Sequence, residues 1–155
     1  MADLVEGASA PEFNLPVDGG ESVALKDLKG KPVVLYFYPK DDTSGCTKEA
    51  ISFSGLKDQF EAQNAIIIGV SPDSVKSHDK FKVKHDLTIM LASDEEKKTV
   101  EDYGVWVEKS MYGRKYMGVE RSTFLIGPDG SIAKIWRKVK VPGHADAVLE
   151  EVKAL

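Results

Sequence analysis

The sequence contains only one cysteine, Cys46, in 155 residues. A single cysteine cannot close an intramolecular disulfide, so the chain is not a disulfide-stabilised scaffold. The same shortage favours a reducing compartment, and we expect a cytoplasmic protein. A disulfide reductase of the Cys-x-x-Cys type needs two thiols, which argues strongly against that activity. Any thiol chemistry in this chain must use Cys46.

Long apolar runs, basic tracts and an amino-terminal signal pattern are missing as well. The apolar runs are far too short to span a bilayer, and the amino terminus has no basic segment followed by an apolar one. The formal net charge of −4 argues against nucleic acid as the main partner. A hydrophobic share of 42% and a charged share of 30% are those of a globular protein. We expect one domain spanning residues 1–155.

An apolar, β-branched and aromatic run at residues 33–38 is the clearest structural signal in the chain. It contains no charge, which is typical of a strand buried on both faces of a sheet. Pro39 ends the strand because proline cannot donate to a sheet ladder. Beyond a polar turn, apolar residues recur at three- and four-residue steps, which predicts a helix over residues 44–63.

The rest of the chain alternates between strand-like and helix-like patterns. We expect an amino-terminal edge hairpin, strands at 65–70, 87–91, 121–126 and 132–139, and helices at 73–85, 93–103 and 145–154. Residues 105–117 fit an edge strand or a surface loop. Together these elements predict an α/β fold in which a mixed central β-sheet is flanked by helices on both faces.

Cys46 falls where the buried strand hands over to the helix. Thr43 is the best candidate for the residue that caps the helix, with its hydroxyl accepting from a free backbone N–H, and Ser44 is the alternative. Cys46 would then occupy the third or second helical position, where free N–H groups and the helix dipole favour a thiolate. Glu49 opposes this effect unless a cation reaches the site or Glu49 is engaged elsewhere. The competing interpretation is that Cys46 is a small buried apolar residue.

The spacing Pro39-x-x-x-Thr43-x-x-Cys46 resembles the active-site motif of the peroxiredoxins. Residues 35–50 are similar in particular to the bacterioferritin comigratory protein, or peroxiredoxin Q, group, as are segments 10–13, 121–126 and 136–140. The resemblance covers nearly the whole chain. It implies a thioredoxin-like fold and a thiol-dependent peroxidase that reduces hydrogen peroxide and organic hydroperoxides without a metal or an organic cofactor.

The resemblance also implies roles for four residues. Cys46 would be the peroxidatic cysteine that is oxidised to a sulfenic acid. Thr43 would hydrogen-bond the peroxide and the thiolate, and Pro39 would shield the sulfur from water. Arg121 would be the cation that favours the thiolate and orients the peroxide. His78 and His85 lie seven residues apart, a spacing that does not suggest a metal site.

The chain departs from the resembled pattern at two positions. Ser44 replaces a proline, which should matter little because serine starts helices well. Ile51 stands where many members carry a second, resolving cysteine. We therefore expect a one-cysteine mechanism in which thioredoxin, glutaredoxin or a small thiol resolves Cys46, in a monomer or weak homodimer. The alternative is a non-enzymatic redox sensor or holdase that acts through mixed disulfides of Cys46.

Overall fold

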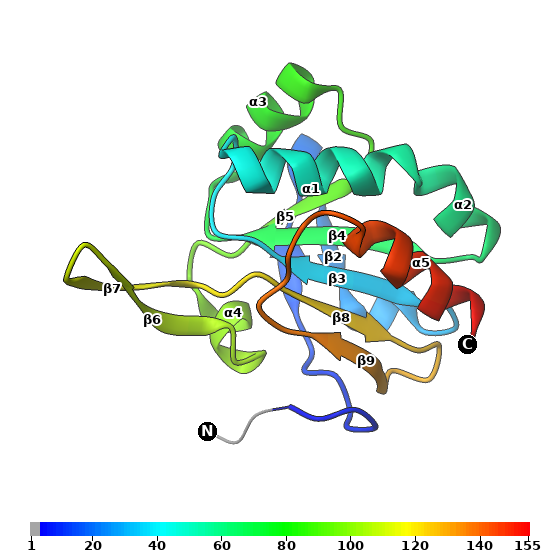
Figure 1. Cartoon of the computed structure of the whole chain (residues 1–155). Coiled ribbons are helices and arrows are strands. Elements are labelled where there is room, and N and C mark those ends of the chain that lie inside the picture. The colour runs from blue at the N-terminus through cyan, green and yellow to red at the C-terminus, as the bar shows by residue number, and fades with distance from the viewer. Residues whose placement is uncertain (1–3) are drawn as a thin grey trace.

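A mixed five-stranded sheet forms the centre of the computed structural model, which describes residues 4–155 (Figure 1). Its strand order is β5-β4-β3-β8-β9. Strands β3, β4 and β5 run parallel, and β8 is antiparallel to both β3 and β9. The strands are β3 (Val33–Phe37), β4 (Ile66–Ser71), β5 (Met90–Ser93), β8 (Ser122–Ile126) and β9 (Ile132–Trp136). The predicted mixed sheet is confirmed.

Helices cover the two faces of the sheet unequally. One face packs against α1 (Ser44–Gly55), α2 (Lys57–Ala62), α3 (Val75–His85) and α5 (His144–Lys153). The other face packs against the short helix α4 (Lys98–Asp102) and the amino-terminal segment. That segment contains the predicted hairpin, β1 (Asn14–Pro16) with β2 (Ser22–Ala24), and the 3-10 turns η1 (Asp18–Gly20) and η2 (Leu25–Leu28).

Strand β3 divides its side chains between two separate cores. Val34 and Tyr36, with Tyr38 just beyond the strand, belong to the core beneath the α1 face. Val33, Leu35 and Phe37 point into the opposite core. Because every side chain of the strand is buried, the alternation of a half-exposed strand is absent from its sequence.

Two predicted helices are shorter than their sequence patterns suggested. The helix expected over 44–63 is broken at Leu56, which separates α1 from α2. The helix expected over 93–103 extends only over α4, because Ser93 still pairs within the sheet and Lys97 takes a left-handed conformation with φ of 64°. The Asp94 carboxylate accepts from the Val100 backbone N–H at 2.8 Å, so the turn before α4 is stabilised by a side chain.

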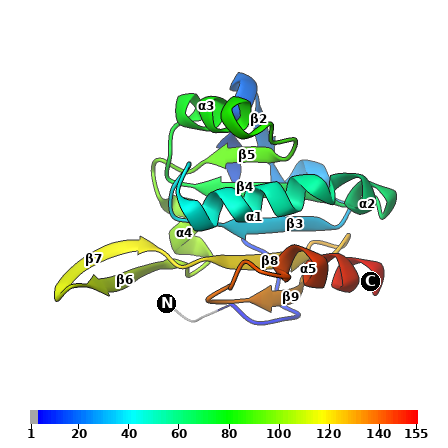
Figure 2. The same cartoon turned by 45° about the horizontal axis from the view of Figure 1, so that its top comes forward.

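Residues 105–117, expected to be an edge strand or a surface loop, belong to a hairpin. Strands β6 (Trp106–Met111) and β7 (Arg114–Val119) pair only with each other. Both views show this hairpin projecting beyond the body, at the end where α1 begins (Figures 1 and 2). We call it the β6–β7 arm. Within the described residues, no helix is long and apolar enough to cross a membrane.

We predict that Gly69→Ala destabilises the fold. A Cβ at Gly69 would lie 2.7 Å from Cζ of Tyr36. The Tyr36 ring cannot easily move away, because it stacks on the ring of Phe53 with 4.7 Å between the ring centroids. We expect the free energy of unfolding, measured with urea, to fall by about 1–3 kcal/mol. Gly55→Ala in α1 is the control, because a Cβ there meets nothing within 4 Å and should stabilise by about 0.5–1 kcal/mol. Equal stability of Gly69→Ala and the parent would contradict the packing described.

Candidate active site

Cys46 occupies the third position of α1 and is 2% exposed. The preceding Thr43 is extended, with φ of −94° and ψ of 158°, and its carbonyl accepts the first helical hydrogen bond from the Thr47 N–H at 2.8 Å. The predicted helix start is therefore confirmed. The predicted side-chain cap is wrong, because the Thr43 hydroxyl instead donates to the carbonyl of Lys40 at 2.8 Å. The sulfur lies where the free N–H groups of the helix favour negative charge.

The guanidinium of Arg121 connects Cys46 to Glu49. Its Nη2 donates to Sγ of Cys46 at 3.2 Å, and its Nη1 donates to Oε1 of Glu49 at 2.7 Å. A Cβ at Gly45 would lie only 3.1 Å from Nη2, so the absence of a side chain at Gly45 allows the guanidinium to approach the helix start. The cation that the sequence argument required is therefore Arg121, and Glu49 pairs with it.

The register of the sheet explains how Arg121 reaches a cysteine so distant in sequence. Strand β8 begins at Ser122, which pairs with Phe37 near the carboxyl end of β3. Arg121 precedes that strand by one residue, so its side chain starts from the same end of the sheet as the loop that leads to Cys46. The carboxyl end of β3 and the start of the neighbouring β8 therefore bring the thiol and the guanidinium to the same end of the sheet.

Glu49 is a buried carboxyl group with an unusual titration. The residue is 1% exposed, and its Oε2 has no hydrogen-bond partner among the described residues. Burial raises the pKa of Glu49 to about 7, although the nearby Arg121 opposes the rise. Near neutral pH the carboxyl group is therefore close to half protonated, and its charge competes with the sulfur for Arg121.

The β6–β7 arm contributes a second cation, Lys109, whose charge interacts with that of Cys46 and which nothing in the sequence singled out. Burial and the neighbouring Arg121 lower the pKa of Lys109, while Cys46 and Glu120 act in the opposite direction. The alkyl chain of Lys109 lies over Gly118, where a Cβ would come within 3.2 Å of its Cδ. A lysine in an irregular, exposed-looking segment gave no signal by which the sequence could have revealed it.

Pro39 and Thr43 lie in the loop that leads from β3 to α1, ahead of Cys46. Pro39 is half-buried one residue beyond Tyr38, and Thr43 is exposed at the helix start. Among the described residues, no hydrogen bond joins Thr43 to the sulfur. Their predicted roles therefore stay predictions.

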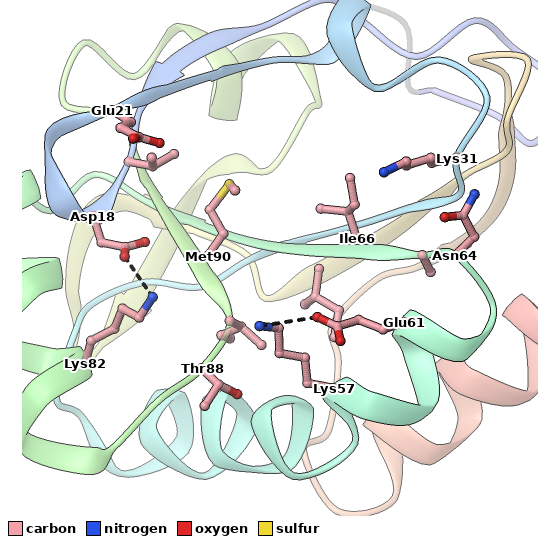
Figure 3. Close-up of a pocket in the computed structure, with 14 residues that line it drawn as sticks. Asp18, Glu21, Lys31, Lys57, Glu61, Asn64, Ile66, Lys82, Thr88 and Met90 are labelled. Atoms are coloured by element: carbon pink, nitrogen blue, oxygen red, sulfur yellow. Dashed lines mark hydrogen bonds and ion pairs between the residues drawn. The ribbon is translucent and has the colours of Figure 1, made fainter.

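The hollow drawn in Figure 3 lies at the opposite end of the sheet. It is bordered by residues at the amino-terminal ends of strands, including Lys31 before β3, Ile66 of β4 and Met90 of β5. Its charged side chains largely satisfy one another. Lys82 pairs with Asp18 at 2.7 Å, and Lys57 pairs with Glu61 at 3.3 Å (Figure 3). Nothing in this hollow connects it to Cys46.

Comparison with known proteins identifies the family. Residues 7–135 match the model of the AhpC/TSA family. Peroxiredoxin Bcp of Bacillus subtilis is 51% identical over 95% of this chain and 94% of its own length. The chain belongs to the peroxiredoxins. A peroxiredoxin Q structure from Xanthomonas campestris superposes with a TM-score of 0.88 at 47% identity, covering 92% of this chain and 90% of that one. The resemblance to the Bcp and peroxiredoxin Q group, the thioredoxin-like fold and the thiol-dependent peroxidase activity are thereby confirmed.

One structural relative differs from this peroxiredoxin in its cysteines. The Xanthomonas campestris peroxiredoxin Q has been solved with either of two cysteines replaced by serine, at 46–47% identity to this chain. That protein therefore has at least two cysteines, whereas this peroxiredoxin has one, Cys46. The enzyme needs a peroxide substrate and a thiol reductant, and the second thiol cannot come from the same chain.

We predict that Arg121→Met slows the oxidation of Cys46 and changes the pH dependence of stability. The second-order rate constant with hydrogen peroxide should fall about 10²-fold or more, because a donor at the reacting sulfur is lost. The pKa of Glu49, about 7 in the parent, should rise further without the cation.

A raised carboxyl pKa contributes stability at low pH that is lost as the pH rises through the folded-state value. Urea unfolding of Arg121→Met should therefore show a steeper loss of stability between about pH 6 and 8 than the parent. Arg114→Met, which removes an exposed arginine from the β6–β7 arm, is the control and should change neither measurement. An unchanged peroxide rate in Arg121→Met would remove Arg121 from the site.

Proposed function

We propose that Cys46 is the peroxidatic residue of this peroxidase. The observation that carries the proposal is the fork of Arg121, which donates to the sulfur at 3.2 Å and to the buried Glu49 at 2.7 Å. A guanidinium held by a second anion is fixed in place before the substrate arrives. Donors fixed in advance stabilise developing charge without reorganisation. A buried structural cysteine would have no use for such a contact.

The reaction balances with Cys46 and a peroxide alone. The thiolate attacks one peroxide oxygen, a sulfur–oxygen bond forms, and the oxygen–oxygen bond breaks. The electron pair leaves on the second oxygen as hydroxide or alkoxide, which then takes a proton. Sulfur becomes a sulfenic acid, the first and reversible oxidation state. Arg121 and the free N–H groups at the start of α1 are the donors available to the charge on that second oxygen.

Thr43 and Pro39 would act on the substrate side of the sulfur. The Thr43 hydroxyl has its only proton engaged with the Lys40 carbonyl at 2.8 Å. Its oxygen lone pairs therefore remain free to accept a hydrogen bond from the protonated oxygen of a hydroperoxide. Pro39 offers a half-buried ring without an N–H at the entrance to the loop. Alkyl peroxide reduction by the related Xanthomonas campestris protein supports organic hydroperoxides as substrates alongside hydrogen peroxide.

Resolution of the sulfenic acid would follow a one-cysteine route. An external thiol condenses with the sulfenic acid, releasing water and leaving a mixed disulfide on Cys46. A second external thiol then attacks the sulfur of the first, a disulfide forms between the two external thiols, and Cys46 leaves as its thiolate. Thioredoxin, glutaredoxin or a small thiol fits this chemistry. A cytoplasmic location and a monomeric or weakly dimeric state stay predictions alongside the identity of the reductant.

We predict that one equivalent of hydrogen peroxide gives a single sulfenic-acid adduct on the parent and none on Cys46→Ser. The measurement is intact mass with a sulfenic-acid trap. Oxidation no faster than that of an unactivated thiol would contradict the assignment of Cys46. Peroxide turnover with an added thiol then separates the peroxidase from the alternative redox sensor or holdase, because only an enzyme consumes peroxide in excess of its own concentration.

Ile51→Cys should install a resolving thiol in the chain. Position 51 is half-exposed in α1, five residues after Cys46. Five residues of intact helix span about 7.5 Å, farther than the roughly 7 Å between α-carbons that a disulfide tolerates. Formation of an intramolecular disulfide after peroxide treatment, seen as loss of two hydrogens by mass, would require the first turns of α1 to unwind. Peroxide-treated Ile51→Cys with only intermolecular disulfides would show that α1 stays helical.

A further inference from the structure

We propose that His78 is a positioning residue for peroxide reduction, which acts through Asp41 on the loop that precedes Cys46 and α1. The proposal rests on the assignment of Cys46 as the peroxidatic residue. It concerns a cluster on α3 that the sequence analysis considered only for metal binding. His78 contacts neither the sulfur nor Arg121, so its influence must pass through the loop.

Both ring nitrogens of His78 face acceptors in a fully buried environment. The residue is 0% exposed, its Nδ1 lies 2.7 Å from Oδ2 of Asp41, and its Nε2 lies 2.9 Å from the carbonyl of Ala92. A carbonyl can only accept, so Nε2 carries a proton. The Nδ1 nitrogen and the Asp41 oxygen share a proton in a buried hydrogen bond. The imidazole therefore links Asp41 on one side to the backbone of β5 on the other.

Asp41 is held from several directions at once. Its carboxylate also accepts from the Tyr38 hydroxyl at 2.5 Å and from the Ser77 hydroxyl at 2.7 Å. Its backbone N–H donates to Oδ2 of Asp73 at 2.8 Å, and that same oxygen accepts from Ser71. The side chain and the backbone N–H of Asp41 are therefore both held by hydrogen bonds. These bonds offset the cost of burying a carboxyl group that is only 7% exposed.

The anchored residue lies in the middle of the reactive loop. Asp41 follows Pro39 by two residues and precedes Thr43 by two, so fixing it restricts both neighbours. The next residue, Asp42, takes a left-handed conformation with φ of 60° and pairs with Lys84 at 2.6 Å and His85 at 2.7 Å. Those pairs are more exposed, and exposed pairs contribute little. The buried pair between Asp41 and His78 is the stronger link between the loop and α3.

A positioning role differs in its consequences from a purely stabilising one. Peroxide reduction needs the thiolate, Arg121, Thr43 and the start of α1 in one arrangement, and small misplacements in such arrangements reduce rates steeply. Alkylation by iodoacetamide needs only an accessible thiolate. The ratio of the two rate constants therefore measures how well the loop is arranged, and global stability does not enter it while the protein stays folded.

The test is His78→Leu, with the rate constants of Cys46 measured for hydrogen peroxide and for iodoacetamide at pH 7. We expect the peroxide rate constant to fall roughly tenfold or more while the iodoacetamide rate constant changes less than about twofold. Val148→Ala is the stability control, because Val148 is fully buried on α5, in the core beneath α1, and takes part in none of the hydrogen bonds that hold Asp41. It should lower the melting temperature and leave the ratio unchanged.

Asp41→Ala keeps the test decisive if His78→Leu fails to fold, because it removes the loop side of the same pair. It should lower the ratio to a similar extent, and the double variant should be no worse than either single one, since the two residues act as a unit. An unchanged ratio in the folded variants, or an equal drop in Val148→Ala, would overturn the proposal. If the parent itself reacts slowly with peroxide, the assignment of Cys46 fails instead, and the two failures are thereby distinguished.

Discussion

The pairing register between β3 and β8 is the constraint on which the active site depends. Phe37 pairs with Ser122, so the loop after β3 and the residue before β8 lie at the same end of the sheet. A slip of one residue would turn every side chain of either strand to the other core. The two cores on opposite faces of β3 prevent such a slip, because each accepts only its own set of side chains. Packing far from the sulfur therefore fixes the distance between Cys46 and Arg121.

Two buried side-chain pairs then fix the loop and the helix start from different sides. Glu49 holds Arg121 against the sulfur, and His78 holds Asp41 beneath the loop. The cost of desolvating a buried pair largely offsets the attraction between its members, so such a pair adds little net stability. Its main effect here is to hold Arg121 and Asp41 in fixed positions. The Glu49 pair has a further property, because a carboxyl group with a pKa of about 7 changes its charge within the physiological range. The attraction of Arg121 to the sulfur thereby depends on pH.

Sequence reasoning predicted the parts of this arrangement that local patterns encode. The buried strand, the helix start at Thr43 and the spacing to Cys46 are all short-range features, and each is confirmed. What could not be predicted depends on contacts between distant segments. Nothing near His78 in sequence indicates that it meets Asp41. The break at Leu56 follows Gly55, a weak helix former, but a single glycine inside an amphipathic pattern did not by itself predict where α1 would end. The choice of Glu49 between solvent and Arg121 was likewise open until the register was known.

The same contacts make opposite demands in the two halves of the catalytic cycle. Cys46 is 2% exposed, which leaves room for a small peroxide but not for a protein thiol. If Cys46 is the peroxidatic residue as proposed, its sulfenic acid would reach a protein thiol only after movement of the loop or of the first turns of α1. Arg121 and Asp41 oppose that movement while the thiolate is present. Once the sulfur carries an oxygen and has lost its negative charge, its attraction to Arg121 weakens, and one of the two restraints relaxes. In this account, oxidation itself loosens the site for the external thiol that a one-cysteine enzyme requires.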